Sequence, residues 1–307
     1  MSDESDKALL EDRLLQDRLA RAGYAVLESF LEPSQVDRLA ALHASTVTEE
    51  LSDTQVFFSA AHSEKDAAVR IDREIRATVQ DEVTRWFGDA TTSCCQFIIK
   101  KADSPNILPP HQDLSSVDET RDRAAMMWIP LRDVDLESGT VGFVPGSHLF
   151  FPDVRCSPTA CQRTKLPYVD YATELFPYMD FPKLRRGDAV VWDAAVIHGS
   201  LANRSSLPRI AATVGLSPPG TRTFLNFFLP GTELSKYERF AVQPSFFLEH
   251  DESRMFSLFE RGKKPDWLES LGVFDHSSST VDREQMIRLI TAAGGREDPT
   301  IAASMAS

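Results

Sequence analysis

Three residues of the types that commonly bind transition metals are His111, Asp113 and His198. His111 and Asp113 flank Gln112 directly after the proline-rich run 105–110, where we expect a strand to meet a loop. Because residues i and i+2 of extended backbone point to the same face, both side chains can reach one ion. Two imidazoles and one carboxylate on one side of a metal leave the opposite coordination positions open, the arrangement that non-haem Fe(II) oxygenases use. The spacing therefore suggests an iron site.

Each of these residues also has an ordinary structural interpretation. An H-x-D pair is short and occurs often by chance. His198 follows the apolar run AVVWDAAVI, and a histidine at the end of a buried strand is commonly hydrogen-bonded in the core. The iron hypothesis therefore depends on the elements that position the three side chains.

The middle of the chain predicts strands. From residue 93 onward it holds short β-branched and aromatic runs with Gly or Pro between them, namely CCQFIIK, AAMMWIPL, TVGFV, AVVWDAAVI and RIAATVGL. No helical pattern long enough for a parallel crossover separates these runs. An antiparallel sandwich or barrel is therefore favoured, giving a mainly β fold with flanking helices.

The segments before and after these strands show mainly helical patterns. Helical spacing over 7–22 is followed by a short strand at 24–27, a second helix that opens at Pro33 with Ser34 as its cap, a polar loop over 45–68 and a third helix over 68–87. We expect one catalytic domain over residues 1–295. Its parts are a helical N-terminal support (1–92), a β core (93–220) with a substrate-covering insertion (150–183), and a helical C-terminal part (221–295), followed by a flexible tail (296–307).

Composition narrows the function classes. The formal net charge of −13 offers no general attraction for nucleic acid or an anionic membrane, so we expect a small-molecule substrate and neither of those partners. Cys94, Cys95, Cys156 and Cys161 lack zinc-site or redox spacing. The acidic N-terminus does not resemble a signal peptide, and no apolar run approaches a membrane span of about 18 residues. These features indicate a cytoplasmic protein, and the oligomeric state is left open.

Three segments carry a family resemblance: HQD, WIPLRDVDLESGTVGFVPGSH and GDAVVWDAAVIHGSLANRSSLPR. In this order and spacing they resemble the phytanoyl-CoA dioxygenase family of 2-oxoglutarate oxygenases, and LARAGYAVLESFLEPSQVDRL resembles its N-terminal opening. The resemblance implies a double-stranded β-helix (a jelly roll, cupin-like) with helices on one outer face. It also implies Fe(II) held by His111, Asp113 and His198, with 2-oxoglutarate and O2 as co-substrates, and a structural role for His148 in PGSH.

A dicarboxylate co-substrate needs a fixed cation for its distal carboxylate, ideally an arginine fork. Arg209 stands at the family's offset from His198, whereas Arg204 lies in a turn-like stretch. Ser200 faces the same side as His198 by strand alternation and resembles a family co-substrate contact. For Arg209 the ordinary alternative is an ion pair at the barrel end.

Two further residues are candidates for the same pocket. Trp128 follows HQD at about the place where the family has an aromatic residue beside the co-substrate, and core packing is its alternative role. Gln96 lies among apolar strand residues, where a buried amide needs partners. A contact to the keto acid or a cross-strand bond would each satisfy it.

By the resemblance, the reaction is hydroxylation of an unactivated C–H bond, with release of succinate and CO2. Halogenating relatives carry a small residue at the position of Asp113, so its carboxylate favours hydroxylation, while desaturation and epoxidation remain open. We expect a small or medium-sized substrate, such as a natural-product intermediate in secondary metabolism or an amino-acid derivative. Aromatic residues of 150–183 would line its walls: Tyr168, Tyr171, Phe176, Tyr178 and Phe181.

Other functions remain possible at this stage. The same chemistry on an acyl-CoA or carrier-bound acyl group is one, although the negative net charge disfavours it. A non-catalytic jelly roll that binds a ligand is another, but such proteins usually lose a metal ligand or the arginine. A zinc-dependent hydrolase or isomerase would leave Arg209 without a purpose.

Overall fold

The structure is a computed structural model that describes residues 8–47, 56–163 and 165–305. Its centre is a sheet of six strands in the spatial order β1-β7-β5-β9-β3-β2, with every neighbouring pair antiparallel. The strands are β1 (Tyr24–Leu27), β7 (Ala189–Asp193), β5 (Ala125–Pro130), β9 (Arg209–Ser217), β3 (Thr91–Lys100) and β2 (Phe57–Phe58).

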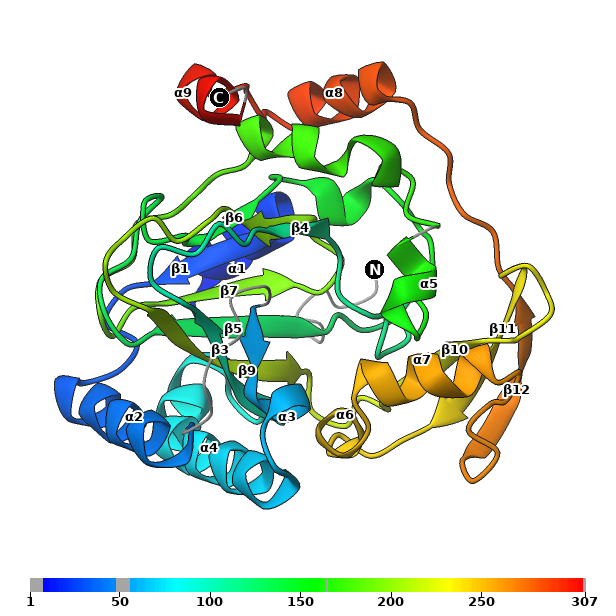
Figure 1. Cartoon of the computed structure of the whole chain (residues 1–307), viewed down its shortest axis with the longest axis horizontal. Helices are drawn as coiled ribbons and strands as arrows, with labels where there is room; N and C mark the ends of the chain where they lie inside the picture. The colour runs from blue at the N-terminus through cyan, green and yellow to red at the C-terminus, as the bar shows by residue number, and fades with distance from the viewer. Residues whose placement is uncertain (1–7, 48–55, 164, 306–307) are drawn as a thin grey trace.

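A second, three-stranded sheet faces the main one. It consists of β4 (Leu108–His111), β8 (His198–Ser200) and β6 (Val141–Phe143), again antiparallel. The ring of Phe143 stacks on Tyr24 of the main sheet at 4.6 Å between centroids and lies 5.4 Å from Trp192. The two sheets therefore enclose a common interior, and the predicted jelly-roll fold is confirmed (Figure 1).

Helices cover the outer face of the main sheet. Helices α2 (Pro33–Thr46) and α4 (Lys65–Phe87) lie on this face, opposite the small sheet, and α1 (Arg13–Ala22) precedes β1 (Figure 1). Strand alternation sorts the side chains, because Met127 and Ile129 pack toward the helices whereas Trp128 packs between the sheets. The same alternation on β3 and β9 sends Lys100 and Arg209 inward.

The structure corrects three of the N-terminal predictions. The helix predicted over 7–22 is shorter, because α1 begins at Arg13 after its Asp12 cap. The predicted helix over 68–87 is α4, while the region 45–68 holds β2 and α3 (Ser59–His62) as well as residues outside the described ranges. Ser34 does not cap α2. Glu32 does so through a reciprocal pair of bonds with Gln35, and Pro33 occupies the first helical turn.

The prediction of a helical part over 221–295 is wrong for most of its length. An antiparallel sheet of β10 (Phe224–Phe228), β11 (Lys236–Ala241) and β12 (Glu269–Asp275) occupies it, together with α6 (Phe246–Glu249), α7 (Glu252–Glu260) and α8 (Arg283–Ala292). The aromatic residues of β10 and β11 form strands because pairing buries Leu225, Phe227 and Phe240 in one cluster. This sheet lies to one side of the jelly roll (Figure 1).

The predicted flexible tail is also wrong where the structure describes it. Residues Pro299–Met305 form helix α9, whose Ile301 is buried, and the Asp298 N–H donates to Pro177 O at 2.7 Å. The docking partner is the segment 150–183, which holds α5 (Thr159–Arg163) and the 3-10 helix η3 (Val169–Tyr178) (Figure 1).

The aromatic residues of this segment mostly pack rather than line a wall. Tyr168, Phe176 and Tyr178 are buried in a cluster with Met286 and Ile290 of α8. Tyr171 and Phe181 pack against the same cluster, half-buried. These side chains therefore attach the segment to the C-terminal helices. In the described part of the chain, no helix is both long and apolar enough to span a membrane.

Candidate metal centre

The structure brings His111, Asp113 and His198 together between the two sheets. His111 ends β4, His198 begins β8, and the two are register partners with ring centroids 4.2 Å apart. His198 Nε2 lies 3.8 Å from Asp113 Oδ1, and one ligand atom from each of the three residues falls within 4.8 Å of the others. Over the described ranges, this is the one cluster of His, Cys, Asp or Glu with such geometry.

Hydrogen bonds set both imidazoles in the same tautomer. His111 Nδ1 lies 2.8 Å from Pro109 O, and His198 Nδ1 lies 3.1 Å from Val196 O. Because a carbonyl only accepts, each Nδ1 must carry the proton, and each Nε2 keeps its lone pair for a metal. Desolvation and the neighbouring His198 lower the pKa of His111 well below its ordinary value, which keeps this ligand neutral at physiological pH.

Asp113 is oriented by bonds on both sides. Trp192 Nε1 donates to Asp113 Oδ2 at 3.0 Å, which leaves Oδ1 facing His198. The Asp113 N–H donates to Ala194 O at 2.9 Å. Two neutral imidazoles and one oriented carboxylate form a donor set that fits Fe(II) with open positions on the far side.

The loop after Asp113 is fixed by residues that sequence reasoning missed. Arg155 is buried, its Nε donates to Asp113 O at 2.6 Å, and its guanidinium pairs with Glu119. Asn226 of β10 donates through Nδ2 to Ser115 O at 2.6 Å. No local sequence motif predicts these contacts, because each joins segments far apart in the sequence.

Arg209 lies in the interior with an incomplete set of partners. It is 2% exposed, one terminal nitrogen donates to Gly139 O at 3.1 Å, and its guanidinium carbon lies 5.4 Å from the Trp128 ring centroid. Arg209 Nε and the hydroxyl of Ser200 are both buried and have no hydrogen-bond partner among the residues that the structure describes. Buried orphan donors beside a cation mark a place for a carboxylate. The structure thus brings Trp128 beside Arg209, while the shared role of these residues with Ser200 stays a prediction.

A second cation, Lys100, stands beside Arg209 and was absent from the predicted set. Lys100 and Arg209 are cross-strand partners on β3 and β9, and Lys100 is fully buried. Its Nζ donates to Ser200 O at 3.0 Å and to Leu201 O. Lysine is seldom buried, so composition gives no hint of this position. Strand alternation was the available signal, because Lys100 lies four residues after Gln96 and therefore faces the same side of the strand.

Gln96 faces the interior but has a protein partner. Its Oε1 accepts from the Ala60 N–H of helix α3 at 3.4 Å, which is not the cross-strand bond expected as the alternative to a co-substrate contact. His148 Nε2 lies 3.1 Å from Ala20 O, a contact that ties its loop to α1.

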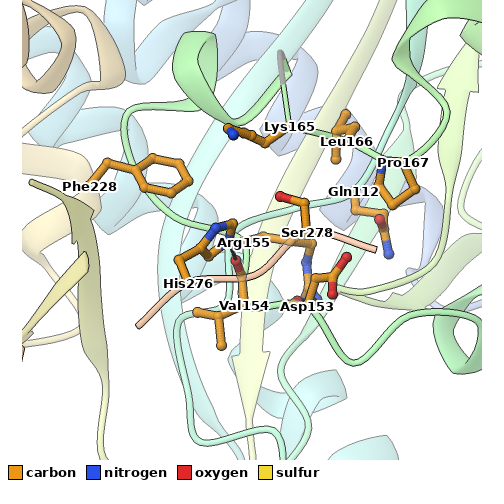
Figure 2. A pocket seen from close by; sticks show the side chains of 10 residues that line it. All are labelled: Gln112, Asp153, Val154, Arg155, Lys165, Leu166, Pro167, Phe228, His276 and Ser278. Carbon is orange, nitrogen blue, oxygen red and sulfur yellow. Dashed lines mark hydrogen bonds between the residues drawn. The ribbon is translucent and has the colours of Figure 1, made fainter. Parts of the chain in front are cut away.

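The side chain of Gln112 points away from the metal ligands. Its Nε2 donates to Ala195 O at 2.6 Å, and it borders a small cavity with Arg155, Lys165 and His276 (Figure 2). A groove of about 710 Å³ shares Lys165 and His276 with this cavity and runs between the segments 165–170 and 276–285.

One curated protein is similar to part of this chain. The mouse protein phytanoyl-CoA dioxygenase domain-containing protein 1 (Mus musculus) is 31% identical over 124 residues, covering 39% of this chain and 42% of that protein. The match thus spans less than half of that relative's length.

Solved structures of similar shape have low sequence identity. The epimerase SnoN, in complex with Fe3+, alpha ketoglutarate and nogalamycin RO, is 19% identical with a TM-score of 0.49, over 88% of this chain and 96% of its own. EvdO2 from Micromonospora carbonacea var. aurantiaca, complexed with 2-oxoglutarate, is 18% identical with a TM-score of 0.49, over 69% and 93%.

The family model for phytanoyl-CoA dioxygenase (PhyH) matches residues 19–211, which is well over half of the chain and includes every predicted metal and co-substrate residue. The resemblance seen in the sequence is therefore confirmed. The chain belongs to the phytanoyl-CoA dioxygenase family.

Proposed function

We propose that this enzyme hydroxylates an unactivated C–H bond of a small or medium-sized molecule, using Fe(II), 2-oxoglutarate and O2. The observation that carries the proposal is the carboxylate of Asp113 in one cluster with His111 and His198, and the buried Arg209 supports the co-substrate part of it. When bound, Fe(II) and 2-oxoglutarate activate O2 and couple decarboxylation to succinate and CO2 with oxidation of the substrate.

In this proposal the chain's own residues bind and orient. His111 and His198 present Nε2 to the metal, and Asp113 adds one carboxylate oxygen while Trp192 holds the other. Because Asp113 occupies the third ligand position, a halide has no room there, which favours hydroxylation. Arg209 and the Ser200 hydroxyl bind the distal carboxylate of 2-oxoglutarate.

The substrate is proposed as a class only. We place it over the face of the metal site beside the segment 150–183, which we propose covers it. Since most aromatic residues of that segment are buried against α8, the substrate contacts come from other side chains of the segment. An acyl-CoA or carrier-bound acyl group is the alternative substrate.

A spectroscopic test examines the metal and co-substrate assignment. Anaerobic Fe(II) and 2-oxoglutarate should give the weak visible charge-transfer band of the chelate, and succinate should form in air with a substrate found by mass spectrometry over a broad panel. His198→Ala should abolish both signals. Absence of the band, with no succinate over the panel, would defeat the proposal.

A further inference from the structure

Lys100 and Arg209 form a pair of buried cations in the co-substrate pocket. They are 0% and 2% exposed and stand opposite each other on β3 and β9. Nowhere in the described ranges does a carboxylate lie within ion-pair distance of either residue. Two like charges buried without a counter-ion are strongly unfavourable, so one of the pair must lose its charge.

The hydrogen bonds around Lys100 indicate which one. A neutral amine has two N–H donors, and Lys100 Nζ donates to two acceptors, Ser200 O and Leu201 O. An ammonium group would have a third N–H that needs an acceptor. Arg209 cannot provide one, because a guanidinium only donates. The geometry therefore suits the neutral amine.

Electrostatics act in the same direction. Burial first, and then the charge of Arg209, lower the pKa of Lys100 to about 6. Burial lowers the pKa of Arg209 only to about 9, so Arg209 keeps its charge at neutral pH. Of the described charged groups, Arg209 on β9 is the one that acts on Lys100, and β8 presents backbone carbonyls.

An incoming carboxylate would reverse this balance. The orphan Arg209 Nε and the unpartnered Ser200 hydroxyl mark where the distal carboxylate would lie, next to the strand segment that Lys100 holds. That anion would offset the charge of Arg209 and offer an acceptor for a third N–H.

We propose that Lys100 is a neutral amine in the free enzyme and takes up one proton from solvent when the distal carboxylate of 2-oxoglutarate binds. This inference rests on the proposed function, because it takes 2-oxoglutarate as the ligand of the pocket. In this step one N–H bond forms on Lys100 Nζ, and the bond to that proton in the buffer acid breaks. Binding of the co-substrate thereby becomes linked to pH, tighter in mildly acidic solution and weaker as pH rises.

Calorimetry measures the proton directly. 2-Oxoglutarate is titrated at pH 7.5 into the anaerobic Fe(II)-loaded protein, in phosphate and in Tris, whose ionisation enthalpies differ. The dependence of the heat on the buffer gives the number of protons taken up. We expect close to one more proton for the wild type than for Lys100→Met, and Lys101→Met, the adjacent lysine on the strand end, should match the wild type.

A second measurement does not depend on the folding of Lys100→Met. The Kd of 2-oxoglutarate for the wild type, followed by the charge-transfer band, should rise toward tenfold per pH unit between pH 7 and 9. Carboxyl groups stay ionised over this range, so the ligand does not contribute. Lys100→Arg, whose charge is permanent, should remove this slope.

The outcomes separate the two proposals. If 2-oxoglutarate does not bind the wild type at all, the proposed function fails. If it binds with equal proton uptake in the wild type and Lys100→Met, or with a Kd unchanged from pH 6 to 9, only the role of Lys100 is overturned.

Discussion

Trp192 gives the sharpest test of how the metal ligands are held. Its indole N–H donates to Asp113 Oδ2 at 3.0 Å, a hydrogen bond to a charged group, whose net value is about 1.5–3 kcal/mol. Asp113 is 30% exposed, so water replaces part of the lost bond and the effect should lie near the lower end. Since about 1.4 kcal/mol corresponds to a tenfold change, we expect Trp192→Phe to weaken metal binding by roughly 10- to 30-fold.

The assay is competition between the protein and a chelator for Co(II), a spectroscopic substitute for Fe(II). Trp128→Phe is the matched control, because Trp128 is buried in the same cluster between the sheets but contacts Arg209 instead of a metal ligand. Trp128→Phe should leave Co(II) affinity unchanged. An equal loss in both variants, or a loss below threefold in Trp192→Phe, would refute the view that the indole bond orients Asp113.

Four further predictions concern the pocket, the loop and the tail. Arg209→Gln should raise the 2-oxoglutarate requirement about 100-fold through loss of a charge-assisted contact, measured as KM with succinate as readout; an unchanged KM would contradict the pocket. Arg155→Met removes a buried guanidinium from the half-buried Glu119 carboxylate and from Asp113 O, and should lower stability by about 3 kcal/mol in urea, whereas a surface ion pair would cost below about 1 kcal/mol. Ile301→Ala should cost about 2–5 kcal/mol, and the exposed Met305→Ala almost nothing; equal values would mean that α9 does not pack in solution. Because the pKa of Lys100 is about 6 when folded and near 10.4 when unfolded, the unfolded state binds the extra proton between these values. Thermal stability of the metal-free protein should therefore rise from pH 6 to 9, and Lys100→Met should flatten that rise.

Short-range rules predicted the residues of the site well. The i, i+2 alternation correctly placed His111 beside Asp113, and Ser200 on the side of His198, because strand geometry alone decides which face a side chain takes. The strands of the core were predicted equally well, since each is a short apolar run between turn residues. The family resemblance then supplied the connection between these distant segments.

Contacts that depend on tertiary packing could not be predicted from the sequence. Arg155 reaches the backbone of Asp113 across the loop, and a carbonyl acceptor leaves no trace in the sequence. Lys100 resembled any strand-end lysine beside Lys101, because its burial depends on the strand opposite. The aromatic residues around Phe227 suit either a helix or a strand, and the pairing with β11 decided the outcome.

The cross-strand pairing of His111 with His198 has a consequence for how the enzyme matures. Each Nδ1 lies on a backbone carbonyl two residues earlier, so backbone contacts restrict how both ligand rings can turn. A site built in this way can fold first and load iron last, unlike small zinc domains that stay unfolded until metal arrives. Iron supply would then govern how much of the folded protein is active, and chelation would switch activity off while leaving the fold intact.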